Sequence, residues 1–120
     1  MRYMLLCYDD ETYWKNAGKA AIDAAMEEVV GTLDELHAKG QLIDCAPLQP
    51  ATGANVQVRD GKRLVTDGPF AETREVLGGY YVIDVDNLDE AIRVAARHPG
   101  ARVGTVEIRP VVELPNLPKV

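Results

Sequence analysis

The 120-residue sequence contains no serine, one phenylalanine, one tryptophan, two cysteines and two histidines. The absence of serine excludes a serine nucleophile. Cys7 and Cys45 form no Cys-x-x-Cys pair, and together with His37 and His98 they match no zinc-ligand spacing. We therefore expect two reduced, buried thiols, no metal site and no bound cofactor.

Long apolar runs and basic clusters are also missing. The apolar stretch near the N-terminus, residues 3–8, is too short for a signal-peptide core or a membrane span, which favours a cytoplasmic location. The formal net charge of −6 argues against direct binding to nucleic acid or to an anionic membrane, because both require clustered Lys and Arg. Gly78-Gly79 precedes an expected strand rather than a helix, so it predicts no phosphate-binding loop.

The length is that of one domain with one packed core. We expect the domain to span residues 1–112 and a proline-rich arm to span residues 113–120. Apolar patterns predict strands at residues 2–8, 41–48, 79–85 and 103–109, and a first helix at residues 19–39. Asn87, with Glu90 three residues later, predicts the start of a second helix. Apolar residues spaced three and four apart predict one buried stripe on the first helix: Ile22, Met26, Val29, Leu33 and Leu36.

Residues 54–66 are predicted to form a hairpin inserted between the two halves of the chain. Asp60-Gly61 is typical of a two-residue primed turn. This turn places Val56 opposite Val65. The hairpin has few apolar residues, so we expect it to project from the main sheet with one side in water.

The element order gives two strand–helix–strand units, which predicts an α+β fold. The expected plan is ferredoxin-like: a four-stranded antiparallel sheet with both helices on one face and the hairpin inserted. The strands at residues 2–8 and 79–85 are apolar on both faces, yet the helices cover only one. We therefore predict a homodimer in which a second copy covers the other face of the sheet.

The segment around Asp67 is the most distinctive in the chain. Asp67 is suited to an Asx turn, Gly68 tolerates unusual backbone angles and Pro69 fixes its own φ. One interpretation is a rigid turn anchored by Phe70. The other places Asp67 at the mouth of a pocket as the catalytic carboxylate, with Glu72 and Glu75 near enough to raise its proton affinity.

The last strand offers a second group of polar candidates. Thr105, Glu107 and Arg109 share one face, and Glu107 and Arg109 are interpreted either as an intersubunit ion pair or as ligand-binding residues. His37 and His98 stand at the expected ends of the two helices, where the helix dipole favours a cation.

Four segments carry a resemblance to a known family: MRYMLL (1–6), VTDGPFAETRE (65–75), LGGYY (77–81) and VEIRP (106–110). The chain resembles DGPF-domain proteins, a branch of the YCII-related family, over residues 1 to about 112. The resemblance implies a dimeric α+β barrel. Relatives of this branch are often encoded beside, or fused to, extracytoplasmic-function sigma factors, which implies a possible regulatory partner.

A histidine–aspartate pair has been proposed as the active site of some relatives. Their histidine falls in the middle of the first helix, where this chain has Glu28, Val29 and Val30, and His37 comes about two turns later. The pair is therefore not carried over, and Asp67 remains the catalytic candidate.

Three functions stay open at this point. The first is an enzyme or binding protein for a small polar or aromatic metabolite, with Arg109 holding an anionic group, Asp67 accepting a proton, and a cleft lined by Tyr8, Tyr80 or Tyr81. The second is a non-catalytic partner of a sigma factor. The third is self-association without a ligand.

Overall fold

The computed structural model describes residues 1–50, 52–68 and 75–118. Its main sheet consists of β1 (Arg2–Asp9), β2 (Leu42–Pro47), β5 (Val76–Asp84) and β6 (Thr105–Pro110), and a separate hairpin consists of β3 (Ala54–Arg59) and β4 (Lys62–Asp67). The helices are α1 (Glu11–Ala17), α2 (Lys19–Ala38), α3 (Leu88–Ala96) and the short 3₁₀ helix η1 (Pro99–Arg102).

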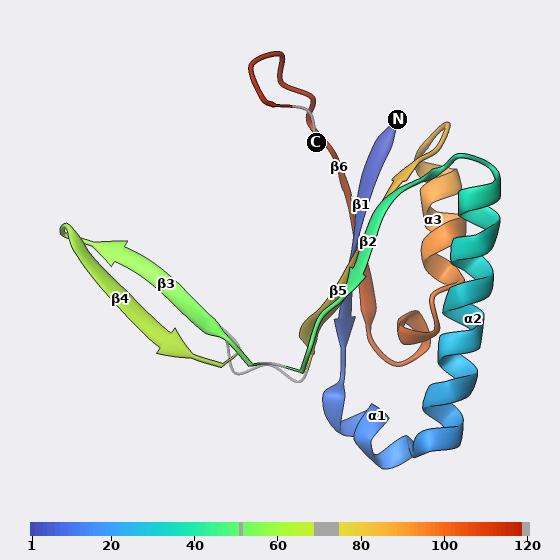
Figure 1. Cartoon of the computed structure of the whole chain (residues 1–120), viewed down its shortest axis with the longest axis horizontal. Helices are drawn as coiled ribbons and strands as arrows, with labels where there is room; N and C mark the ends of the chain where they lie inside the picture. Colours follow the sequence, from blue (N-terminus) through green and yellow to red (C-terminus); the bar gives the residue numbers. More distant parts are fainter. Residues whose placement is uncertain (51, 69–74, 119–120) are drawn as a thin grey trace.

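The main sheet has the strand order β2-β5-β1-β6, and every neighbouring pair is antiparallel. Both α2 and α3 lie on the same face of this sheet, whereas the hairpin leaves from the opposite side (Figure 1). The α+β class predicted from the sequence is therefore confirmed, with the predicted order of two strand–helix–strand units and an inserted hairpin. We call the sheet face without helices the open face.

The core lies between the helices and the central strands. Side chains alternate along a strand, so every second residue of β1 and β5 faces the helices. Leu5 and Ile83 are fully buried on this side, and they pack with Leu36 of α2 and Val94 of α3.

The hairpin has the predicted register. Val56 lies opposite Val65, and the turn residues Asp60 and Gly61 have φ angles of 51° and 74°. Positive φ at both central positions is the requirement of a type I′ turn. As expected, the hairpin projects away from the main sheet (Figure 1).

Two short helices depart from the sequence-based expectation. The acidic stretch after β1 was expected to be a turn, but Asp10 accepts a hydrogen bond from the backbone N–H of Tyr13 at 3.1 Å and thereby caps α1. The last strand begins at Thr105, two residues later than predicted, because residues 99–102 form η1 and the Gly104 N–H donates to the Gly100 carbonyl at 2.6 Å.

Ion pairs connect α2 to the segment that follows α3. Glu28 pairs with Arg102 at 3.0 Å, and Glu35 pairs with both Arg97 and Lys39. The Glu28–Arg102 pair links α2 to η1 and the Glu35–Arg97 pair links α2 to the end of α3, next to the site described below. Among the described residues, no helix is both long and apolar enough to cross a membrane.

Candidate functional site

A cavity of about 460 Å³ lies between α2 and the main sheet. The cavity exists because only one end of the predicted apolar stripe of α2 is packed against other side chains. Leu36 at one end of the stripe is 2% exposed, but Ile22 and Met26 at the other end are 39% and 49% exposed. The N-terminal half of α2 thus presents its apolar face to an opening instead of to packed side chains. The cavity wall is mainly apolar on the α2 side, with Ile22, Ala25, Met26, Val29, Val30 and Leu33.

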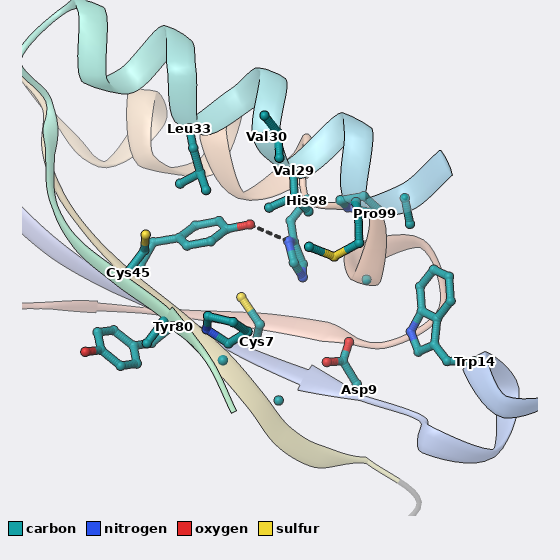
Figure 2. Close-up of a pocket in the computed structure, with 18 of the residues that line it drawn as sticks. Cys7, Asp9, Trp14, Val29, Val30, Leu33, Cys45, Tyr80, His98 and Pro99 are labelled. Atoms are coloured by element: carbon teal, nitrogen blue, oxygen red, sulfur yellow. Dashed lines mark hydrogen bonds between the residues drawn. The ribbon is translucent and has the colours of Figure 1, made fainter. Parts of the chain in front are cut away.

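The polar groups of the cavity come from the sheet and from the segment that follows α3. Tyr81 comes from β5. Asp9 stands at the end of β1, and His98 joins α3 to η1 (Figure 2). Three glycines without side chains, Gly78, Gly79 and Gly100, also line this part of the wall.

Glycine at positions 78 and 100 makes room for the Asp9 carboxyl group. A Cβ atom on Gly78 would clash with Asp9 Oδ2. A Cβ atom on Gly100 would lie 2.7 Å from Asp9 Oδ1 and 2.8 Å from His98 Nε2. Asp9 Oδ1 and His98 Nε2 therefore border the same small space beside Gly100, where there is no room for a Cβ atom.

A hydrogen bond fixes the imidazole of His98. The Tyr81 hydroxyl and His98 Nδ1 are 2.7 Å apart, and the two rings meet edge to face at 84°. The other ring nitrogen, Nε2, is turned toward the side of the cavity that holds Asp9 (Figure 2). The hydroxyl can either donate to Nδ1 or accept from it, so His98 can present Nε2 either as a donor or as an acceptor.

Burial shifts both titratable groups toward their neutral forms. It raises the pKa of Asp9 above the usual range for a carboxyl group, and the charges of Glu11 and Glu75 add to this, while a hydrogen bond from Trp14 opposes it. Burial, followed by the nearby charge of Arg102, lowers the pKa of His98. At neutral pH the imidazole is therefore uncharged.

Cys7 and Cys45 both line the cavity, and Cys7 is not an activated nucleophile. Burial, with the charge of Asp9 in second place, raises the pKa of the Cys7 thiol to about 12. A thiol attacks as its thiolate, so this environment suppresses its reactivity. The expected buried thiol is found at Cys7, whereas Cys45 is only half-buried.

A second cavity of about 390 Å³ adjoins the first. Asp9, Trp14, Ile22 and Gly78 line both of them. Trp14 belongs to α1, a helix without buried residues, and Gly18 connects it to α2 with a φ of 91° that favours glycine. The indole of Trp14 thus stands at the boundary between the two cavities. In the described part of the chain, no group of three or more His, Cys, Asp and Glu side chains is gathered to hold a metal ion.

The candidate residues from the sequence fall into separate places. Tyr80 and Tyr81 both line the cavity. The side chain of Tyr80, however, is directed to the open face, where its hydroxyl donates to Asp44 Oδ2 at 3.0 Å. Tyr8, Glu107 and Arg109 also meet on the open face, with 3.4 Å between the Tyr8 hydroxyl and Glu107 Oε1 and 3.8 Å between Arg109 and Glu107.

Asp67 is exposed at the end of β4 and lines neither cavity. Its predicted helper Glu72, and Phe70 of the same turn, lie outside the described residues. The catalytic role of Asp67 stays a prediction.

Sequence reasoning missed Asp9, and for His98 it favoured the role of a cation at a helix end over that of a general base. Asp9 is the last residue of β1 and His98 follows the end of α3, and both of these positions line the cavity. The available signal was small: Asp9 follows a buried strand, and glycines stand in two distant segments, at positions 78 and 100. Glycine in or beside a strand often marks the close approach of another group, but the sequence does not say which group approaches.

The fold and cavity define a small α+β protein with a ligand-sized pocket between its helices and its sheet. The model of the YCII-related domain matches residues 1–115, so the chain belongs to the YCII-related family. A curated protein of Rhizobium meliloti (strain 1021) is 36% identical over 124 residues, which cover 97% of this chain and all of the relative. That relative is itself named as uncharacterised.

Proposed function

We propose that this protein binds a small, mainly apolar carbonyl compound in the cavity beneath α2 and transfers protons on it. The observation that carries the proposal is the pairing of a neutral His98, oriented by Tyr81, with the Asp9 carboxyl group at the polar end of an apolar pocket. Pairs of titratable groups with pKa values shifted by burial are typical of acid–base sites. The pocket volume is in the range for small-molecule ligands.

The reaction step uses the neutral form of both groups. His98 Nε2 accepts a proton from the carbon beside the carbonyl group, and the electron pair of that C–H bond forms a C=C bond. Burial raises the pKa of Asp9 and so enlarges the fraction of molecules in which its carboxyl group is protonated; this form donates its proton to the carbonyl oxygen, which yields an enol, an imidazolium and a carboxylate. The imidazolium then gives its proton to a different carbon of a conjugated enol while the Asp9 carboxylate takes back the proton of the enol O–H, which restores the carbonyl group and both residues and completes an isomerisation without a cofactor.

Two further observations support this choice. The suppressed reactivity of the Cys7 thiol favours proton transfer over covalent catalysis. The resemblance places the proposed histidine of relatives in the middle of the first helix, and Val29 and Val30 at that point of α2 line this same cavity. His98 reaches the same cavity from the segment that joins α3 to η1.

Ligand binding can be tested with the single tryptophan, because Trp14 lines the cavity. We expect neutral aromatic ketones to change its fluorescence, and we expect His98→Gln to weaken this binding. The matched control is His37→Gln, since His37 is the other histidine of the chain and is exposed on α2. Equal binding by both variants would exclude His98 from the ligand site.

Proton transfer can be tested separately by deuterium incorporation. In D₂O, the protein should accelerate exchange of the hydrogens beside the carbonyl group of a bound ketone, as measured by proton NMR. We expect His98→Gln and Asp9→Asn to abolish the acceleration and His37→Gln to retain it. Binding without exchange in the unaltered protein would reduce the proposal to a binding protein.

We also propose a homodimer through the open face, as the sequence predicted. The open face carries Met4, Leu6 and Val82, and both helices lie on the other side. Light scattering at micromolar concentration tests it, and a monomer would contradict it. A sigma factor as partner remains a prediction from the resemblance, on which the cavity has no bearing.

A further inference from the structure

One face of the β3–β4 hairpin carries three exposed valines, with Arg63 opposite Val58 on the same face. Val56 and Val58 of β3 are each 62% exposed, and Val65 of β4, directly opposite Val56, is 54% exposed. The alternate positions form the other face, which contains Asn55, Gln57, Leu64 and Thr66. Adjacent exposed valines on one face of a strand pair are typical of a surface that another polypeptide covers.

The hairpin gains little support from the rest of the chain. It is a two-stranded sheet of its own. A two-stranded hairpin without further packing is only marginally stable in water. The radius of gyration is 16.3 Å, whereas a compact domain of this length has roughly 14 Å. The molecule is therefore extended by an arm whose exposed valines are not covered by any other described part of the chain.

The tip of this arm differs in charge from the rest of the protein. Residues 59–63 contain Arg59, Lys62 and Arg63, which are three of the 13 cationic side chains, but only one of the 19 carboxylates, Asp60. With a formal net charge of −6 for the whole chain, the remainder is strongly acidic. A second copy of this chain therefore offers a surface of opposite charge to the arm.

We infer that the arm docks on a second copy of the chain, with Val56, Val58 and Val65 against the partner's sheet and the cationic tip beside acidic side chains. The inference rests on the proposed homodimer and names the element that holds it together. The hairpin leaves the main sheet on the side of the open face (Figure 1). The open face presents the carboxylates of Asp44 and Glu107 beside apolar side chains. A twofold axis would repeat the contact, so each subunit would give one arm and receive one.

The apolar contact is tested by Val56→Thr/Val65→Thr in the full-length chain, with sedimentation equilibrium as the readout. Threonine keeps the shape and strand preference of valine but is poorly suited to a dry interface. Because each substitution occurs twice in a symmetric dimer, we expect the dissociation constant of the dimer to rise at least about tenfold. The matched control is Gln57→Thr/Leu64→Thr, the directly opposed pair on the other face, which should leave dimerisation unchanged.

The charge contact is tested by Lys62→Gln/Arg63→Gln. Salt should weaken the unaltered dimer, and this dependence should become smaller in the variant. A dimer of unaltered affinity in the valine variant would overturn the arm contact while leaving the homodimer in place. A monomeric unaltered protein would overturn both, and the arm would then be free for a different protein. Circular dichroism confirms that each variant keeps its main sheet and helices.

Discussion

The two halves of the interface between α2 and the sheet are built from one apolar stripe but serve different purposes. At the C-terminal half, Leu36 and its neighbours pack on Leu5 and Ile83, and the side chains are almost completely buried. At the N-terminal half, Ile22 and Met26 face a cavity of about 460 Å³. The same residue types therefore contribute stability at one end of the helix and a binding wall at the other.

The difference comes from the side chains that oppose the stripe. Near Leu36 the sheet offers large residues such as Leu5 and Tyr81, which fill the space. Near Met26 the opposing wall contains Gly78, Gly79 and Gly100, which leave it open. Small residues opposite an apolar helix face thus create a pocket without any break in the helix pattern.

The largest stability effect is expected in the packed half. Leu5 is 0% exposed, so Leu5→Ala removes buried methyl groups and leaves a cavity. We expect the free energy of unfolding to fall by about 3 kcal/mol, as measured by urea denaturation with circular dichroism. A loss below about 1 kcal/mol would mean that the packed half is as loose as the open half.

The next effect is expected at the glycine wall. Gly78→Ala introduces a Cβ atom against the Asp9 carboxyl group, so we expect a loss of about 1–3 kcal/mol in unfolding free energy. The clash is with a side chain, and removing that side chain should relieve it. In an Asp9→Ala background the same glycine substitution should cost clearly less, as a double-mutant cycle measures. Equal costs in both backgrounds would show that Gly78 is needed for another reason.

A smaller effect on the free energy of unfolding is expected at the polar end of the cavity, and this effect depends on pH. The pKa of Asp9 is raised on folding, so its carboxylate destabilises the fold as pH rises from the ordinary value of 3.8 through the folded pKa. Asp9→Asn should therefore be the more stable protein at neutral pH, and this advantage should vanish below pH 3.8. Urea denaturation at several pH values measures both.

For His98, the free energy of unfolding is expected to change with pH in the opposite direction, and in a different pH range. Its pKa is lowered on folding, so stability is retained above the ordinary value of 6.5 and is lost as pH falls through the folded pKa. His98→Gln should remove this loss. If both variants followed the pH dependence of the unaltered protein, the two groups would be solvated like surface residues, and the cavity would lack its polar end.

Much of the fold was predictable because its signals are local and periodic. The hairpin register follows from Asp60-Gly61 alone, and the N-cap at Asn87 is confirmed by its hydrogen bond from the Glu90 N–H at 3.0 Å. The helix stripe was equally plain in the spacing from Ile22 to Leu36. What the stripe packs against was not predictable, because this depends on residues distant in the sequence, such as Leu5 and Ile83 for Leu36.

The candidate site was harder to predict from the sequence for the same reason. Tyr80 and Tyr81 were equivalent candidates in sequence, but strand alternation sends one to the open face and the other to His98. The closeness of Asp9 and His98 depends on the packing of the segment after α3 against the end of β1, around Gly100. No local motif records the proximity of positions 89 residues apart.

The smallest stability effect is expected at the open half of the stripe, and it separates binding from folding. Met26 is 49% exposed, so Met26→Ala should lower the free energy of unfolding by less than about 1 kcal/mol. The same change removes apolar wall from the cavity and should weaken ketone binding several-fold, as read from Trp14 fluorescence. Leu5→Ala should show the reverse order of effects, with a large loss of stability and little change in affinity under conditions where it is folded. A large loss of stability in Met26→Ala would instead make this half of the helix part of the core, and the division of α2 into a packed end and a binding end would be wrong.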